Sequence, residues 1–369
     1  MSERLRPGSM IGIIGGGQLG QMMGLSAIQS GYRVAVLDPD PNCPCAVFAQ
    51  PLIVADYTDV TALAQLCEMS DVVTYEFENA DSNLIETFNI NNKIPQGALA
   101  LTLSSHRLKE KAFAQFLDIP TPTYHPIHTQ DDLMKLNDFP LIIKSCRFGY
   151  DGKNQIVIRQ KQDLADLKLD FTQEYIAEKL IRFEKEISVV CACFKDGISF
   201  FEPFENVHVN GILSTATHPA VLSTTQAQKA LEYTEKIAQA LDYIGVLAVE
   251  YFVTQDEILF NEMAPRPHNS AHGTIEGCTF SQFDLHIAAI TKAPLIQPRR
   301  IANTMMINIL GQDLQQVLSV LDELDPDLAH LHLYGKKEAR TNRKIGHLTL
   351  CAATAEDLIK EAQRTWRHL

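Results

Sequence analysis

The sequence lacks the patterns that define several common classes of protein. None of its eight cysteines forms a C-x-x-C pair, and the two C-x-C pairs at 43/45 and 191/193 have no matching set of His or Cys partners. We therefore expect no zinc site, and we predict reduced, mostly buried thiols in a cytoplasmic protein. No apolar run is long enough to cross a bilayer, and residues 1–7 do not have the layout of a signal peptide. A membrane partner is accordingly not expected.

The chain also lacks an excess of positive charge. Its 45 acidic and 32 basic residues give a net charge of −13, whereas nucleic-acid binders carry a basic surface. We therefore expect no nucleic-acid partner. A protein of this charge that binds an anionic ligand must concentrate its cations locally, so clusters of Lys and Arg are informative. The length of 369 residues, with 46% hydrophobic and 21% charged, suits a soluble globular protein of roughly two or three domains.

The N-terminal segment predicts a βαβ unit. Residues 10–21 have the pattern of a strand, a glycine turn and the start of a helix, and residues 32–38 that of a second strand ending in Asp38. This pattern is Rossmann-like, with Asp38 where a dinucleotide fold holds a ribose. Alternatively, the glycines only let the helix approach a strand, with no dinucleotide bound. A further strand ends with Glu76 and Glu78, either a ligand site or simply a polar strand exit.

The pattern changes near residue 103, where we place a domain boundary. Ser104 or Ser105 is expected to cap a helix that continues to Phe116. A strand, a loop with two glycines at 149–155 and another strand then predict a flexible flap. A Walker A loop would instead require a final Lys-Ser/Thr and a following helix. Strands are predicted at 175–181 and 185–190 and a helix at 225–241, and a link near residue 297 leads into a small third domain.

The most informative segment is a predicted β-hairpin whose polar turn contains Asp256. A reversal at this turn places Glu250 opposite Glu262, and like charges across a strand pair are destabilising. A divalent cation between them removes the penalty, and Mg²⁺ takes carboxylate oxygens where it also holds phosphates. The alternative is a pair of solvated carboxylates on an exposed ribbon. The polar run at 264–272 that follows the hairpin favours a phosphate-handling metal site.

A short C-terminal segment is rich in basic side chains: Lys336, Lys337, Arg340, Arg343, Lys344 and His347. Such a run is either a solvated charged face or a phosphate-binding patch that closes over a substrate.

Together these motifs resemble the ATP-grasp enzymes, and most closely the family of 5-(carboxyamino)imidazole ribonucleotide synthetases of purine biosynthesis. The resemblance covers nearly the whole chain and rests on GGGQLG (15–20), YEFEN (75–79), FGYDGK (148–153), FEKEIS (183–188), NEMAPRPHNS (261–270) and KIGH (344–347). The GYDG loop and the APRPHNS run are its most specific parts. It implies an α/β (α+β) fold with a Rossmann-like N-terminal domain (1–103), an ATP-grasp domain (104–297) and a small C-terminal domain (298–369).

The resemblance also implies the chemistry. ATP would phosphorylate bicarbonate in the presence of Mg²⁺, and the amine of 5-aminoimidazole ribonucleotide would capture the carboxyl group to form N5-carboxyaminoimidazole ribonucleotide. Members of the family are typically homodimers, so a homodimer is expected here.

Site residues are carried over from the family position by position. The nucleotide set is Arg107, Lys144, Gly149, Tyr150, Gly152, Lys153, Gln155, Glu178, Lys179, Leu180, Ile181, Glu186, His208, Asn261 and Glu262. The metal set is Glu250 and Glu262. The catalytic set, part of which surrounds bicarbonate, is Asp151, Arg266, His268, Asn269 and Lys337. The ribonucleotide set is Glu76, Tyr150, Asp151, Lys337, Arg340, Arg343 and Lys344.

Three alternatives remain open at this point. Another ATP-grasp carboxylase or a formyl-transfer ligase with a different phosphorylated amine acceptor would share these motifs. An NAD-dependent dehydrogenase would fit the glycine-rich opening but leaves Glu250, Glu262 and the run around His268 without a role. A nucleotide-binding regulator without catalysis would be marked by loss of a metal carboxylate or of the flap acid, and this chain retains both.

Overall fold

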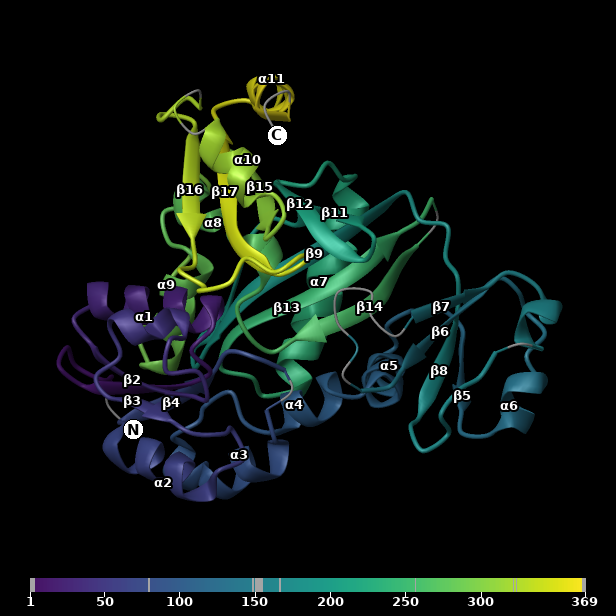
Figure 1. Cartoon of the computed structure of the whole chain (residues 1–369), viewed down its shortest axis with the longest axis horizontal. Coiled ribbons are helices and arrows are strands. Elements are labelled where there is room, and N and C mark those ends of the chain that lie inside the picture. The colour runs from purple at the N-terminus through teal and green to yellow at the C-terminus, as the bar shows by residue number, and fades with distance from the viewer. Residues whose placement is uncertain are drawn as a thin grey trace.

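The computed structural model describes residues 4–78, 80–147, 149, 155–165, 167–255, 257–320, 322 and 324–366. Within these residues three sheets and their covering helices form the molecule (Figure 1). The helices are α1 (Gln18–Gln29), α2 (Val60–Met69), α3 (Ser82–Phe88), α4 (Leu99–Ser104), α5 (Arg107–Phe116), α6 (Gln130–Met134), α7 (Thr224–Ala240), α8 (Thr274–Gly277), α9 (Gln282–Ile290), α10 (Leu314–Ser319) and α11 (Ala355–Trp366). Short 3-10 turns are η1 (Pro44–Val47), η2 (Ile90–Asn92), η3 (Lys161–Leu164) and η4 (Asn269–Ala271).

The N-terminal sheet is parallel and buried on both faces. Its strands, in the order β3-β2-β1-β4, are β3 (Leu52–Val54), β2 (Arg33–Asp38), β1 (Met10–Ile14) and β4 (Val72–Tyr75). Every residue of β1 is buried, as expected where helices cover both sides of a parallel sheet. One face packs against α1 and α9, and the other against α2. Because α9 lies far along the chain, the N-terminal sheet shares its core with the central domain.

A second sheet, with strand order β5-β8-β6-β7, is antiparallel. Its strands are β5 (Tyr124–Ile127), β8 (Tyr175–Lys179), β6 (Leu141–Ser145) and β7 (Gln155–Ile158). It has a hydrophobic core of its own, which includes residues of α6 and η3. The sheet therefore forms a separate lobe, seen to the right of Figure 1.

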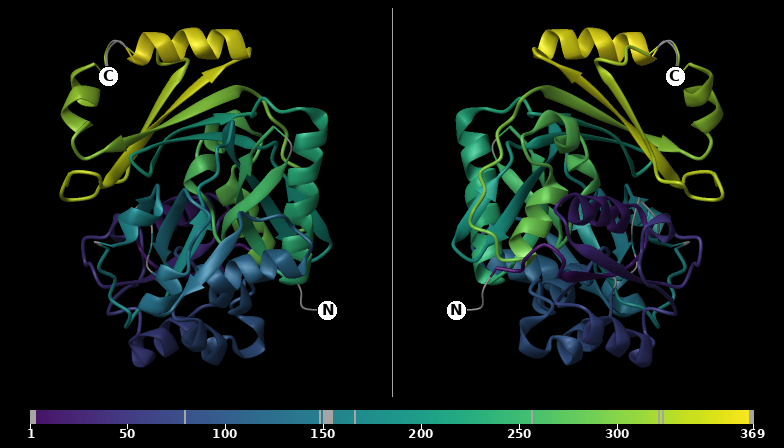
Figure 2. Two further views of the ribbon diagram at one scale, coloured as in Figure 1. Left: turned by 90° about the vertical axis from the view of Figure 1, so that its right-hand side faces the viewer. Right: turned by 90° about the vertical axis from the view of Figure 1, so that its left-hand side faces the viewer.

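The third sheet is antiparallel and links the central and C-terminal parts of the chain. Its order is β14 (Ile258–Ala264), β13 (Gly245–Val253), β9 (Lys185–Phe194), β11 (Phe204–Val209), β12 (Ile212–His218), β15 (Asn303–Leu310), β17 (Lys344–Ala352) and β16 (Ala329–Leu333), and β10 (Gly197–Phe200) pairs with β9. Because β12 pairs with β15, the C-terminal strands continue the central sheet. Figure 2 shows them rising from the body of the molecule, with α11 at the end opposite the N-terminal helices.

Most predicted elements are present, and the hairpin register is confirmed. Glu250 pairs with Glu262 across β13 and β14. The predicted cap of α5 is wrong, because α4 continues through Ser104 and the residue before α5 is His106. The first amide of α5 instead donates to a backbone carbonyl of the loop after β6. The strand predicted at 175–181 ends at Lys179.

Two expectations from composition can be compared with the structure. All eight cysteines are buried and none of them is joined in a disulfide, as predicted. No helix in the described part of the chain is long and apolar enough to cross a membrane. The division into three domains at residues 103 and 297 stays a proposal. The first boundary falls within the last turn of α4, and the second in the link that precedes β15.

The first turn of α1 provides a test of the packing in the N-terminal domain. A Cβ atom on Gly20 would clash with the backbone carbonyl oxygen of Gly15, which cannot move aside like a flexible side chain. We expect Gly20→Ala to lower the free energy of unfolding by about 1–3 kcal/mol, although alanine favours helices. Urea denaturation measures this change. The exposed control Gln29→Ala, at the end of the same helix, should change it by less than about 0.5 kcal/mol; equal effects would contradict the packing argument.

Candidate active site

Two cavities share part of their lining, and the first of them lies between the two antiparallel sheets. The first cavity, of about 380 Å³, is lined by β6 and β8 on one side and by β9, β13 and β14 on the other. The second cavity, of about 1080 Å³, is lined by β12, β15, α10 and the segment 336–344. Both cavities are lined by Gln18, Glu78, Leu213, Arg266 and Lys344. A group bound in the first cavity therefore faces a ligand in the second.

A β-bulge in β14 determines which side chains enter the first cavity. Glu250 pairs with Glu262 and Tyr251 pairs with Phe260, so Asn261 is an extra residue in β14. Successive strand residues normally face opposite sides of a sheet, whereas a bulge re-aims a side chain. As a result, both Asn261 and Glu262 line the first cavity.

The two facing glutamates differ in their preferred charge. Burial alone would raise the pKa of Glu262, but the charge of Arg107, whose Nη1 donates to its Oε2 at 2.9 Å, lowers that pKa. Burial and the nearby charges of Glu262 and Glu186 raise the pKa of Glu250 to about 8. The protein alone thus leaves Glu250 poorly compensated, which is the situation that a bound cation relieves.

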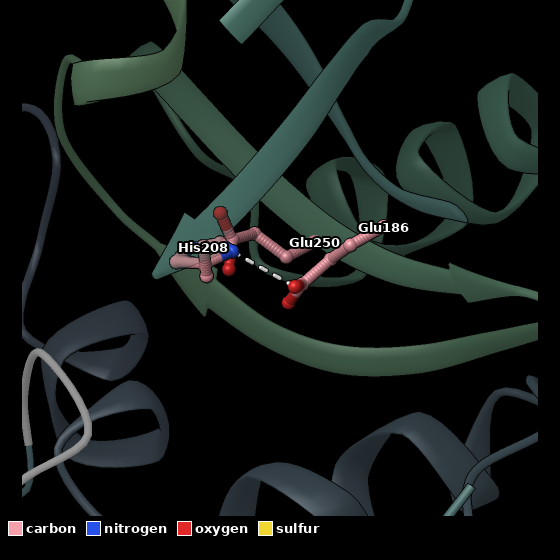
Figure 3. Close-up of side chains that lie close together, drawn as sticks. All are labelled: Glu186, His208 and Glu250. Carbon is pink, nitrogen blue, oxygen red and sulfur yellow. Dashed lines mark ion pairs between the residues drawn. The ribbon is translucent and has the colours of Figure 1, made fainter. Parts of the chain in front are cut away.

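The oxygen atoms around these glutamates fit a divalent cation. The Oδ1 atom of Asn261 is buried and has no hydrogen-bond partner among the described residues, while its Nδ2 donates to Glu186 at 3.3 Å. Glu186, His208 and Glu250 offer ligand atoms within 4.8 Å of one another, and Figure 3 shows their side chains converging. Carboxylate and amide oxygens suit Mg²⁺. This cluster contains Glu250 of the pair predicted from the hairpin but not Glu262, so the metal site at that pair stays a prediction.

Buried positive charge lies at the opposite wall of the first cavity. Lys144 donates to Glu178 at 2.9 Å, and Lys111 lies 3.7 Å from the same carboxylate. Burial would raise the pKa of Glu178, but the charges of these two lysines outweigh it and lower the pKa to about 2. The cavity wall then continues along Lys179, Leu180 and Ile181 at the end of β8.

The polar run after β14 is held from both sides. The carbonyl of Pro265 accepts from Gln96 Nε2 at 3.0 Å and from the Tyr243 hydroxyl at 2.6 Å. The backbone of His268 bonds the Gln282 side chain twice, with each distance 2.7 Å. Between these anchors Arg266 donates through Nε to Glu78 at 2.6 Å. The guanidinium is thus fixed at the junction of the two cavities.

His268 is electrically neutral in this environment. Burial, together with the positive charges of Arg266 and Lys344, lowers its pKa to about 3. Its Nδ1 atom lies 2.8 Å from the Ser270 hydroxyl and accepts a long bond from the Ser270 amide. This pattern assigns the proton to Nε2, which lies 3.7 Å from a Glu250 oxygen. The imidazole can therefore donate a hydrogen bond towards the metal-binding end of the cavity.

The structure brings most predicted site residues together. The first cavity is lined by Arg107, Lys144, Gly149, Gln155, Glu178, Lys179, Leu180, Ile181, Glu186, His208, Glu250, Asn261, Glu262, Arg266, His268, Asn269 and Lys344. The second cavity is lined by Arg266, Arg340, Arg343 and Lys344. Glu76 and Lys337 are not among the described residues that line either cavity. Tyr150, Asp151, Gly152 and Lys153 lie outside the described residues.

Glu76 is occupied elsewhere. Its two oxygens accept from the amides of Gly17 and Gly20, each at 2.6 Å, and Asp38 accepts from the amide of Gly16 at 2.7 Å. In a dinucleotide fold, amides at this helix N-terminus bind the pyrophosphate. Here the protein's own carboxylates take that place, which argues against the dehydrogenase alternative.

Among the further residues that line the cavities, Glu78 and Lys336 were candidates from the sequence without a place in a ligand set, and Gln18 had no assigned role. Glu78 shares the end of β4 with Glu76, but only Glu78 reaches the cavities, where it pairs with Arg266. Gln18 follows the glycine turn and lines both cavities, and Lys336 rather than Lys337 lines the second. Glu78 and Lys336 lie close to the predicted residues Glu76 and Lys337 in the sequence, which was the only indication of their role. The sequence does not show which way side chains at strand ends and in loops point.

Comparison with known proteins identifies the family. The chain matches the ribonucleotide synthetase preATP-grasp domain over residues 9–104, the ATP-grasp domain over 112–283 and the phosphoribosylaminoimidazole carboxylase C-terminal domain over 304–361. It is 39% identical to N5-carboxyaminoimidazole ribonucleotide synthase of Bacillus subtilis strain 168, covering 98% of this chain and 96% of that protein.

Solved structures agree with this match. An ADP complex of an N5-carboxyaminoimidazole ribonucleotide synthetase has 41% identity and a TM-score of 0.95, and the match covers 100% of this chain and 99% of the other. The Aspergillus clavatus N5-carboxyaminoimidazole synthase in complex with ADP and 5-aminoimidazole ribonucleotide has 30% identity and a TM-score of 0.90, with 98% of each chain covered.

The fold and the site define an ATP-grasp ligase, an enzyme that uses ATP. Within the ATP-grasp ligases, similarity of sequence and structure over essentially the whole length of the chain identifies one family. The chain belongs to the family of N5-carboxyaminoimidazole ribonucleotide synthases of purine biosynthesis.

The lowered pKa of Glu178 predicts that this residue stabilises the fold to an extent that depends on pH. Its pKa in the folded protein is about 2, below the ordinary value of 4.5, so its stabilising effect is complete above about pH 4.5 and is lost as the pH falls towards 2. We expect Glu178→Gln to lower the free energy of unfolding near neutral pH by an amount on the order of 3 kcal/mol, because Lys111 and Lys144 lose their counter-charge.

Urea denaturation at a series of pH values tests this expectation. The difference between wild type and Glu178→Gln should shrink as the pH is lowered below about 4.5, while the exposed control Glu86→Gln on α3 should show little difference throughout. A difference that stays constant with pH would contradict the assignment.

Proposed function

We propose that the two cavities carry out two successive steps of one reaction, in which this ligase carboxylates 5-aminoimidazole ribonucleotide with ATP and bicarbonate. The first cavity would hold ATP and form carboxyphosphate, and the second would hold the ribonucleotide. The observation that carries this proposal is the shared wall at Arg266, Lys344 and Glu78, since an unstable activated carboxyl group must meet its acceptor without crossing solvent.

In the first cavity we assign the residues by their charge. Arg107 and Lys144 would bind ATP phosphates, the end of β8 at Glu178–Ile181 would contact the adenine, and Glu186 with His208 would contact the ribose. Glu250, Glu262 and Asn261 would hold Mg²⁺, which neutralises charge on the phosphates as they are transferred. Arg107 now pairs with Glu262. Insertion of the metal nucleotide would exchange that pair for contacts of each partner with the ligand.

At the junction, Arg266, His268 and Asn269 would surround bicarbonate and the carboxyphosphate made from it. Arg266 offers a guanidinium for planar carboxylate-like oxygens, and the neutral imidazole offers its Nε2 hydrogen. These donors are held by backbone and side-chain bonds before the reaction starts, so they need little reorganisation as charge develops. Arg266 and His268 would therefore stabilise the transferring group without becoming covalently attached to it.

In the second cavity the basic side chains would hold the 5′-phosphate of the ribonucleotide. Arg340, Arg343 and Lys344 line this cavity, as does Lys336, which we add to the set in place of Lys337. Of the flap residues, Tyr150 and Asp151 would contact the ribonucleotide, with Asp151 orienting its amine, while Gly152 and Lys153 would belong to the nucleotide set. The family resemblance carries two further expectations: that the protein acts as a homodimer, and that it works in the cytoplasm.

ADP release with labelled bicarbonate is the direct test of the proposed function. With ATP, Mg²⁺ and bicarbonate present, addition of 5-aminoimidazole ribonucleotide should strongly stimulate ADP release and carry the label into the ribonucleotide. A ribonucleotide that lacks the free amine serves as the control and should not be carboxylated, because it offers no nucleophile. ATP turnover that is indifferent to 5-aminoimidazole ribonucleotide would overturn the acceptor and point to another phosphorylated amine.

A further inference from the structure

One face of α5 carries three charged side chains that are almost completely buried. Arg107, Glu110 and Lys111 are 8%, 1% and 0% exposed. Their spacing of i, i+3 and i+4 places them side by side on the helix. Lys and Glu are rarely buried to this degree unless their polar atoms have partners. The atoms to which these three side chains bond therefore indicate the role of this face of α5.

All three side chains reach the bulge of β14. Glu110 accepts from the amide of Met263 at 2.6 Å, and Lys111 donates to the carbonyls of Asn261 at 2.7 Å and Phe260 at 3.2 Å. The bonds from Glu110 and Lys111 thus lie on either side of Asn261 and Glu262, whose side chains face the cavity. Arg107 bonds the side chain of one of them, at 2.9 Å.

This bulge needs support from outside its own sheet. Among the described residues β14 is the last strand in its sheet, so no described strand pairs with its outer edge, and the bulge interrupts the ladder on its inner edge. Unpaired backbone groups that are buried cost free energy. On the outer edge Phe260 donates its amide to the carbonyl of Pro120 at 2.7 Å, and α5 supplies the remaining bonds through Glu110 and Lys111.

We infer that Glu110 and Lys111 are positioning residues, which hold the β14 bulge in the arrangement that turns both Asn261 and Glu262 into the first cavity. In a regular strand these two neighbours would face opposite sides of the sheet, and one oxygen ligand would be lost. The pair therefore controls the affinity for the divalent cation through the backbone of β14, although Glu110 also lines the first cavity. This inference rests on the proposed role of Asn261 and Glu262 in holding the metal nucleotide.

Lys111→Met is the principal test, because it keeps the length of the side chain and removes both bonds to the bulge. Binding of Mn²⁺, as a spectroscopic substitute for Mg²⁺, is measured in the presence of ATP from the enhancement of the water-proton relaxation rate when the Mn²⁺–ATP complex binds the protein. We expect Mn²⁺ to bind roughly 10–100-fold more weakly than to wild type, the usual consequence of losing a residue that supports metal ligands.

Lys93→Met is a matched control. Lys93 also donates to two backbone carbonyls, those of Cys67 at 2.7 Å and Ser70 at 2.8 Å, but it does so in the N-terminal domain. Both substitutions should lower the free energy of unfolding, since each leaves two carbonyls without their lysine, and Lys111→Met more so because it also removes a counter-charge from Glu178. Only Lys111→Met should weaken Mn²⁺ binding. A merely structural role for Lys111 would change stability alone.

A second pair of variants keeps the inference testable if Lys111→Met does not fold. Glu110→Gln retains an oxygen that can accept from the Met263 amide, whereas Glu110→Leu does not. We expect Glu110→Leu to weaken Mn²⁺ binding roughly tenfold or more, and Glu110→Gln to restore most of it.

The possible results separate this inference from the proposed function. Wild-type binding of Mn²⁺ with ATP, together with unchanged binding in Lys111→Met and Glu110→Leu, would overturn the positioning role alone. Absence of ATP-dependent Mn²⁺ binding in the wild type would overturn the metal site and the positioning role together. Selective weakening in these two variants supports both.

Discussion

The opposition of Glu250 and Glu262 across a buried strand pair is the constraint on which the site depends. Two carboxylates in register repel each other, and burial increases the cost. Arg107 compensates the negative charge of Glu262. The raised pKa of Glu250 shows that the charge of the second carboxylate is not fully compensated. In the proposed function a divalent cation would complete the compensation. Phosphates bound to that cation would face the lysine and arginine side chains of the opposite wall, so the metal and the nucleotide would be recognised as one ligand.

The arrangement of the sheets explains how one chain can couple two chemical steps. The central sheet continues through β12 and β15 into the C-terminal strands, so one sheet contributes to the walls of both cavities. Arg266 stands at their junction, paired with Glu78 from the N-terminal domain. Residues from all three parts of the chain therefore meet where, in the proposed function, the activated carboxyl group would be passed on. Preformed donors at this point would favour transfer over hydrolysis.

Sequence reasoning succeeded where local pattern decides the structure and failed where distant contacts decide it. Alternating strands around a polar turn were enough to place Glu250 opposite Glu262. The bulge at Asn261 could not be predicted, because its backbone is bonded by Lys111, which lies 150 positions earlier in the chain. Likewise two acids at the end of β4 were identified as candidates, but the glycine turn, by binding Glu76, decides that Glu78 faces the cavities. The flap assignments remain predictions.

The central claim is that a divalent cation bridges these glutamates to ATP, and thermal unfolding tests it most directly. A ligand that binds only the folded state raises the unfolding midpoint, by the equivalent of about 2.7 kcal/mol at one hundred times its dissociation constant. The account predicts that ATP with Mg²⁺ raises the midpoint of the wild type, that ATP with a chelator does so far less, and that Glu262→Gln loses the difference between the two. An equal rise with and without Mg²⁺ in the wild type, or a Mg²⁺-dependent rise that survives in Glu262→Gln, would contradict it.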